Sequence, residues 1–97
     1  MRTTIIAKNE LEPLLERLIK QLDQEGRLTH KAHFKRIHWR LTHAHTDLDL
    51  AAPIIDLSSA RAIGFEFSST AHALIARILD KTRFLVDELA EQERQVH

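Results

Sequence analysis

The residues best suited to chemistry or to binding lie in one stretch of the chain, residues 27–45. The stretch contains no Asp or Glu, and its cationic or titratable side chains are Arg27, His30, Lys31, His33, Lys35, Arg36, His38, Arg40, His43 and His45. The whole chain has 14 Lys and Arg against 14 Asp and Glu, so a basic segment lies within a neutral protein. The segment also carries Trp39, the single Trp. An aromatic side chain among cations is typical of a binding surface.

The density of histidines raises the question of a metal site. Ligands on one helix must lie three or four residues apart, and the pairs with this spacing are His30/His33, His43/Asp47 and His45/Asp49. The sequence has no HExxH motif and no Cys to complete a typical zinc site. We therefore predict no metal and no cofactor. A pH- or metal-responsive His-rich protein is kept as a second alternative.

Signatures of catalysis are also missing. The serines at positions 58, 59, 68 and 69 lie outside any Gly-x-Ser-x-Gly turn and are better suited to capping helices. With two glycines in 97 residues, the sequence contains neither a P-loop nor a dinucleotide-binding motif. We predict that the protein is not an enzyme.

Helices must position these side chains. Residues that favour helix are abundant, and apolar residues recur at intervals of three and four. This pattern predicts helices over residues 10–24, 30–49, 53–63 and 69–93. Asn9 and Thr29 are suitable N-caps for the first two helices, and Pro53 suits the first turn of the third. The prediction is an all-α, compact, four-helix bundle-like single domain.

A minor β element stays open as an alternative. Residues 3–7 are rich in β-branched side chains, and apolar residues alternate over residues 62–67. These two segments are expected, at most, to form a two-stranded pairing. Such a pairing is marginal without other strands.

The apolar stripes predict a common core. Its expected members are Leu14, Leu18, Phe34, Ile37, Leu41, Ile75 and Ile78. The same stripes put Leu48 on the buried side of the second helix and Ile55 on that of the third. At about 100° per residue, Trp39 falls opposite the buried side of its helix. The candidate partner-binding residues on that exposed face are Lys35, Arg36, Trp39, Arg40 and His43.

Two kinds of partner suit a basic face that contains Trp. The first is an acidic protein surface, which includes self-association with the acidic residues 87–93 of a second copy. We expect a small binding or regulatory protein of this kind. The alternative is a nucleic-acid-binding accessory protein, for single-stranded or duplex DNA, with phosphates on the cations and a base stacked on Trp39. The neutral net charge disfavours this alternative.

The sequence also bears on location. No apolar run approaches the roughly 18 residues of a membrane span, and the N-terminal apolar patch is too short for a signal peptide. The expectations are no membrane partner and a cytoplasmic location.

Overall fold

The computed structural model describes residues 2–59 and 64–96, and the side chains of residues 4–59 and 64–91. Its elements are α1 (Arg2–Gln24), α2 (Leu28–Thr42), the short 3-10 helix η1 (Leu48–Leu50), α3 (Ala51–Ser58) and α4 (Ser69–Val96). No strand occurs in this part of the chain. The predicted all-α fold is confirmed.

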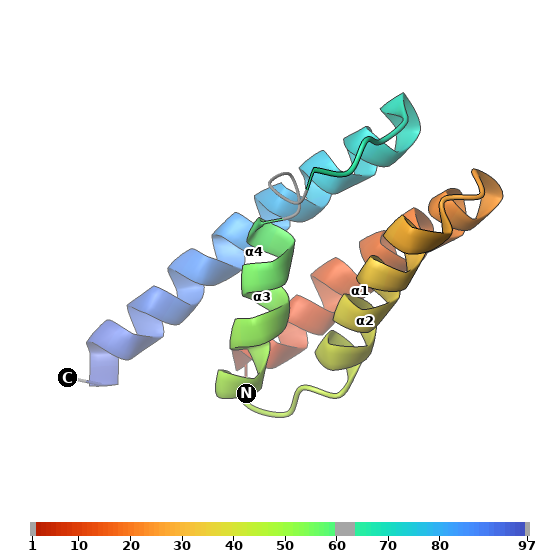
Figure 1. The fold of residues 1–97 in the computed structure, drawn as a ribbon. Helices are drawn as coiled ribbons and strands as arrows, with labels where there is room; N and C mark the ends of the chain where they lie inside the picture. The colour runs from red at the N-terminus through yellow and green to blue at the C-terminus, as the bar shows by residue number, and fades with distance from the viewer. Residues whose placement is uncertain (1, 60–63, 97) are drawn as a thin grey trace.

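The two long helices, α1 and α4, run side by side in opposite directions (Figure 1). An ion pair of 2.9 Å between Lys81 Nζ of α4 and Glu10 Oε2 of α1 joins them. Helix α2 packs on the other flank of α1, and the short α3 crosses between α2 and α4. The C-terminal end of α4 projects beyond the other helices, which gives the molecule its long dimension of 47 Å.

The core forms where the apolar stripes of the helices meet. All seven predicted core residues are buried, and they belong to one continuous cluster. Helix α1 contributes the largest share of that cluster: Ala7, Leu11, Leu14, Leu15, Leu18 and Leu22. The apolar stripe thus extends to Ala7, which precedes the predicted start of the first helix at residue 10.

Helix α1 begins at Arg2, so the predicted start near Glu10 is wrong. Pro13 lies inside the helix and has no N–H to donate to the carbonyl of Asn9. Asn9 and Pro13 are both exposed, which leaves that carbonyl within reach of water. Thr4 and Ala7 are buried, and Thr4 Oγ1 donates a 3.2 Å hydrogen bond to Asp47 Oδ1, so tertiary contacts of the first turns offset the bond lost at Pro13.

The predicted pairing of residues 3–7 with residues 62–67 is wrong. Residues 3–7 lie within α1, and the burial of Thr4 and Ala7 favours a helix there. Residues 64–68 form no strand, and Phe65 and Phe67 lie against His30 of α2 instead. Residues 62 and 63 lie outside the described part of the chain.

Helix α2 ends at Thr42, so the predicted end at residue 49 is also wrong. The next helical segment starts with reciprocal hydrogen bonds between Thr46 and Asp49. Thr46 Oγ1 accepts the Asp49 N–H (3.2 Å), and Asp49 Oδ2 accepts the N–H groups of His45 (3.0 Å) and Thr46 (3.1 Å). This is a capping box, which satisfies free N–H groups at a helix start and so separates η1 and α3 from α2.

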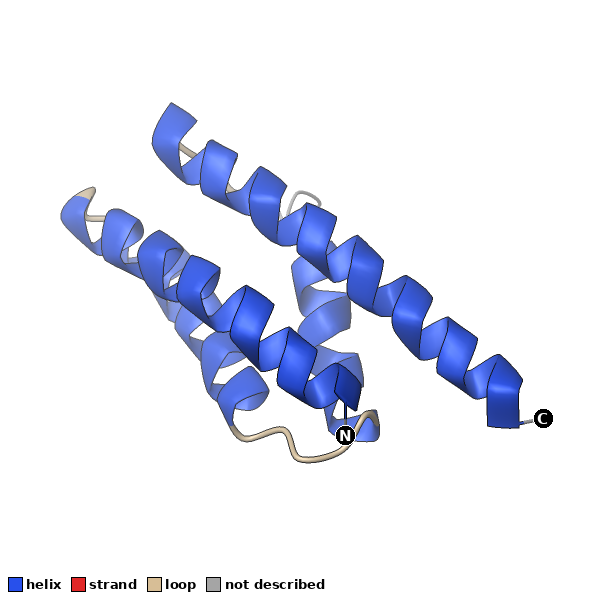
Figure 2. Ribbon diagram, turned by 180° about the vertical axis from the view of Figure 1, so that it is seen from behind, coloured by secondary structure: helices blue, strands red, loops and turns tan. Residues whose placement is uncertain are grey.

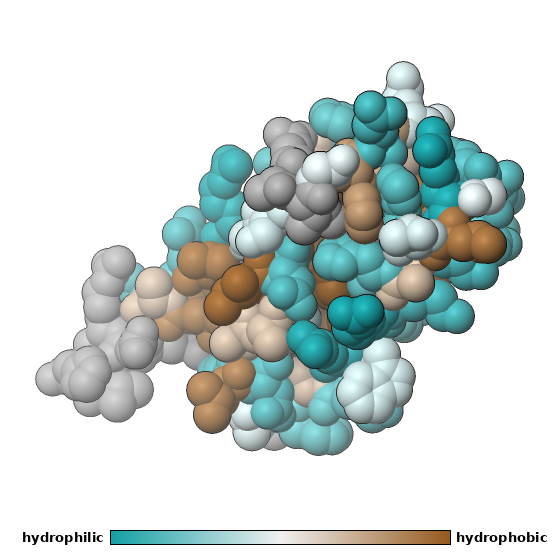
Figure 3. Space-filling model, in the orientation of Figure 1, coloured by the Kyte–Doolittle hydropathy of each residue, from teal (hydrophilic) through white to brown (hydrophobic). Residues whose placement is uncertain are grey.

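The new boundaries change which side chains are buried. Helix α3 spans Ala51–Ser58 rather than residues 53–63, of which residues 60–63 lie outside the described part. Leu48 is 84% exposed and Ile55 is 62% exposed, so the prediction that they are buried is wrong. Leu48 belongs to a separate short helix, and α3 buries Pro53, Ile54 and Leu57 instead. Hydrophobic residues consequently gather on the surface over α3 and the C-terminal half of α4 (Figure 3).

Helix α4 starts at Ser69, as predicted, and continues to Val96. Ser68 caps it, because its Oγ accepts the Ala71 N–H at 3.1 Å. The same hydroxyl donates a 2.6 Å hydrogen bond to Glu25 Oε2 at the end of α1. This bond, followed by one from Gln21, lowers the pKa of the Glu25 carboxyl. Ser68 therefore both caps the N-terminus of α4 and links α4 to the end of α1 by a hydrogen bond.

Candidate functional site

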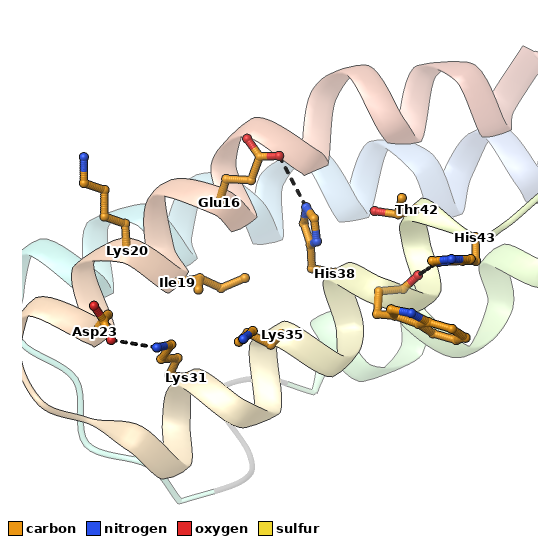
Figure 4. Close-up of a pocket in the computed structure, with 10 residues that line it drawn as sticks. Glu16, Ile19, Lys20, Asp23, Lys31, Lys35, His38, Thr42 and His43 are labelled. Atoms are coloured by element: carbon orange, nitrogen blue, oxygen red, sulfur yellow. Dashed lines mark hydrogen bonds and ion pairs between the residues drawn. The ribbon is translucent and has the colours of Figure 1, made fainter.

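A groove of about 570 Å³ lies between the C-terminal half of α1 and the exposed side of α2 (Figure 4). The residues that line it are Glu16, Ile19, Lys20 and Asp23 from α1, Lys31, Lys35, His38, Trp39 and Thr42 from α2, and His43, the C-cap residue of α2. Within each helix these residues recur three or four positions apart, so they lie on successive turns of one side. We refer to this feature as the α1–α2 groove.

Trp39 stands at one end of the α1–α2 groove and is 60% exposed. The imidazole of His43 stacks on its indole, with ring centroids 4.1 Å apart and an angle of 23° between the planes. The Nδ1–H of His43 can also donate to the Trp39 carbonyl, at 2.8 Å. One face of the indole is therefore covered, while the rest of this large side chain faces solvent.

The floor of the groove is apolar and its rim is charged. Ile19 projects from α1 into the space between the helices (Figure 4) and packs on the edge of the core. Lys31 Nζ lies 2.6 Å from Asp23 Oδ1. This hydrogen bond, and then the charge of Lys31, lower the pKa of the Asp23 carboxyl. Lys20 and Lys35 form no ion pair with any carboxylate in the described part of the chain, so the rim has a surplus of positive charge.

His38 lines the groove and has a ring nitrogen without a hydrogen-bond partner among the described residues. Its Nε2 atom is buried and has no hydrogen-bond partner among the described residues. The nearest carboxylate oxygen, Glu16 Oε1, lies 3.5 Å away, close enough for electrostatic attraction but without the geometry of a hydrogen bond.

The structure brings together three of the five predicted partner-binding residues. Lys35, Trp39 and His43 line the groove, whereas Arg36 and Arg40 do not. Arg40 points towards α3 and forms an ion pair with Asp56, with Nη1 and Oδ2 3.3 Å apart. The groove residues that sequence reasoning missed are Glu16, Ile19, Lys20, Asp23, Lys31, His38 and Thr42. No local motif marks them, because they meet only when α1 packs beside α2.

Two histidines of the basic segment serve packing instead. The His30 ring stacks on Phe65 (centroids 4.1 Å apart), and its Nε2–H donates to the Glu66 carbonyl at 3.0 Å. His33 lies edge-on to Phe65, and its Nε2 atom is buried without a hydrogen-bond partner in the described part of the chain. Burial lowers the pKa of His33, because it disfavours the charged imidazolium. These rings hold residues 64–67 against α2.

His45 and Asp49, which are four residues apart, both take part in the hydrogen bonds of the capping box. Both N–H groups of His45 and Thr46 point at the Asp49 carboxylate, and these hydrogen bonds lower its pKa. Within the described residues, no group of three or more His, Asp or Glu side chains is placed to hold a metal ion. The close spacing of these two residues therefore has a structural explanation.

Comparisons with known protein families, with curated proteins and with solved structures gave no match. None of the described helices combines the length and the apolar character needed to cross a membrane.

Proposed function

We propose that this is a non-catalytic, cytoplasmic binding or regulatory protein whose α1–α2 groove receives an acidic, amphipathic helical segment of a partner protein. The observation that carries the proposal is the 60% exposed Trp39 beside two lysines, Lys20 and Lys35, that lack an ion pair among the described residues. An exposed Trp contributes strongly to affinity when a partner covers it.

The composition of the groove supports a helical partner. An amphipathic helix binds by laying apolar side chains into a groove between two helices, with anchors one turn apart. Ile19 and the indole of Trp39 offer apolar contact, while Lys20 and Lys35 would face acidic residues at the edge of the bound helix. Such charges mainly speed association and select the partner, whereas the buried aromatic contact sets the dissociation rate.

Nucleic acid is the weaker candidate for the same surface. Glu16 and Asp23 line the groove and would repel the evenly spaced charges of a phosphate backbone, whereas an acidic helix can place its few carboxylates beside Lys20 and Lys35 only. His43 already covers one face of the Trp39 indole, so a base has only the other face for stacking. Acidic protein is therefore the partner chemistry that fits better.

The test is a titration monitored by Trp39 fluorescence. The probe is a synthetic helical peptide that carries a Phe with Asp four residues before it and three residues after it. The comparison ligands are the same peptide with Lys in place of Asp, and a single-stranded oligonucleotide. We expect saturable binding of the acidic peptide, weakened by salt, and no binding of the Lys peptide.

Matched variants locate the site. Trp39→Ala removes the single Trp, so calorimetry replaces fluorescence for this comparison. Trp39→Ala should bind the acidic peptide about tenfold or more weakly, whereas Leu28→Ala, which changes a 67% exposed residue of the same helix outside the groove, should bind it as the wild type does. Lys35→Glu should also weaken binding of the acidic peptide. Arg27→Glu makes the same change of charge outside the groove and should leave this binding unchanged. Equal binding of both peptides, or tighter binding of the oligonucleotide, would overturn the proposal.

A further inference from the structure

We propose that the acidic segment received by the α1–α2 groove belongs to a second copy of this chain, namely the part of α4 around Phe84. The inference rests on the proposed function and names its partner. The protein would then form a dimer through the groove of one copy and α4 of the other.

The segment has the properties that the groove requires. Phe84 is 51% exposed, and Asp80 and Asp87 lie four residues before it and three residues after it, on the same side of the helix. Neither aspartate forms an ion pair with a described cation, whereas the neighbouring Lys81 is neutralised by Glu10. Asp80, Phe84 and Asp87 are called the α4 ridge below.

The α4 ridge complements the α1–α2 groove in both shape and charge. The ridge offers one aromatic ring between two carboxylates that lie about 10 Å apart along the helix. The groove offers Ile19 and Trp39 as apolar surface, with Lys20 and Lys35 at its rim. Docking would place Phe84 on Ile19 and the adjacent indole of Trp39, with one aspartate directed towards Lys20 on α1 and the other towards Lys35 on α2. Docking would cover two exposed aromatic residues and would give each of the four unpaired charges an oppositely charged neighbour.

The positions of the two surfaces allow a closed dimer. Helix α1 borders both: Glu10 lines the hollow beside Phe84, and the turns from Glu16 to Asp23 line the groove. Seen from behind, α1 lies in front with α4 on one flank and α2 on the other (Figure 2). Ridge and groove thus flank opposite halves of the same helix. A twofold axis across α1 would place each ridge on the partner's groove, which closes the assembly at two copies.

The experiment uses charge reversal in two complementary variants. The first reverses the groove (Lys20→Glu with Lys35→Glu), and the second reverses the ridge (Asp80→Lys with Asp87→Lys). Sedimentation velocity over a series of concentrations measures self-association of each variant and of the wild type. Like charges would face each other within each variant alone, so we expect self-association to weaken by about tenfold or more in both. Circular dichroism checks that both variants remain helical.

An equimolar mixture of the two variants gives the decisive result. Every acidic ridge then meets a basic groove, and every basic ridge meets an acidic groove, so we expect the mixture to form a heterodimer. General damage to the fold would not be repaired by mixing. Phe84→Ser should also weaken the dimer, whereas Ile55→Ser, which changes a similarly exposed residue of α3, should not. A mixture that stays monomeric, or a dimer insensitive to Phe84→Ser, would overturn the inference.

The outcomes separate this inference from the proposed function. The ridge-reversed variant keeps an intact groove, so it should still bind the acidic peptide while it no longer self-associates. If the wild type binds the peptide but is monomeric at all concentrations, the partner is another protein and only this inference fails. If the wild type neither binds the peptide nor self-associates, both proposals fail.

Discussion

The imidazole of His43 lies flat against the indole of Trp39, with 4.1 Å between their centroids, and its Nδ1 lies 2.8 Å from the carbonyl of the same Trp39. Residues four apart lie above one another on a helix, so the last turn of α2 itself supplies this support. We expect this stacking to restrict the orientation of the indole, although it is 60% exposed. An aromatic anchor held in place before binding loses less conformational entropy when a partner arrives.

Replacement of His43 should therefore loosen Trp39. In His43→Ala, we expect faster motion of the indole, measured by NMR relaxation of its Nε1–H group. We also expect weaker binding of the acidic peptide, by a factor that corresponds to about 1 kcal/mol. His43→Phe keeps the stacked ring but loses the hydrogen bond, and it should retain most of the order. An indole equally rigid in His43→Ala would show that the stacking does not hold it.

Truncation in the core should cost far more than truncation on the surface. Leu18 and Leu41 are fully buried, so Leu18→Ala or Leu41→Ala should lower the free energy of unfolding by about 2–5 kcal/mol. Leu48→Ala makes the same chemical change at an 84% exposed position and should alter it by less than about 0.5 kcal/mol. Urea unfolding measures all three variants. A loss at Leu48 similar to that at Leu41 would contradict the observed burial.

The capping box should contribute measurably to stability. Thr46→Ala removes the hydroxyl that accepts the Asp49 N–H and should lower the free energy of unfolding by about 1 kcal/mol, whereas Thr46→Ser should keep most of it.

Acid should remove the contribution of Asp49. The N–H groups of His45 and Thr46 lower the pKa of Asp49 in the folded protein. Its contribution is therefore present above its unfolded pKa and is lost as the pH falls through the lowered value. Asp49→Asn should be less stable than the wild type at about pH 7, and the difference should narrow as Asp49 becomes protonated. A difference that does not change with pH would argue against this origin.

His33 should make the fold sensitive to mild acid. Burial lowers its pKa, the nearby charge of Arg36 lowers it further, and Asp56 of α3 partly opposes both. The unfolded chain therefore binds a proton at higher pH than the folded chain does. The contribution of neutral His33 is complete above the unfolded pKa of about 6.5 and is lost as the pH falls below it.

Urea unfolding at about pH 7.5 and about pH 5.5 tests this prediction. The wild type should be less stable at the lower pH, and His33→Leu should reduce that dependence. His72→Leu changes an exposed histidine of α4 and serves as the control, which should keep the wild-type dependence. If the wild type is equally stable at both pH values, the prediction that protonation of His33 destabilises the fold is wrong.

Local patterns in the sequence were sufficient for the fold class, most of the core and the exposure of Trp39. Each of these depends on the side of a helix on which a residue falls, and that side follows from spacing alone. Thr46 and Asp49 also carry the spacing of a capping box, a local pattern that would have ended the second helix earlier. An end of the second helix before Thr46 is therefore predictable from the sequence.

Only the tertiary structure decided where α1 begins and where the groove lies. Local rules favour a start at Asn9 because Pro13 disrupts a helix interior. However, Thr4 is buried and donates a hydrogen bond to Asp47, which is distant in the sequence, and Ala7 is buried in the common core. Likewise, Ile19 and Lys20 join Trp39 only because α1 packs beside α2. Spacing along the chain determines which side of a helix is apolar. The packing of distant helices determines which polar sides face one another, and these long-range contacts leave no local pattern.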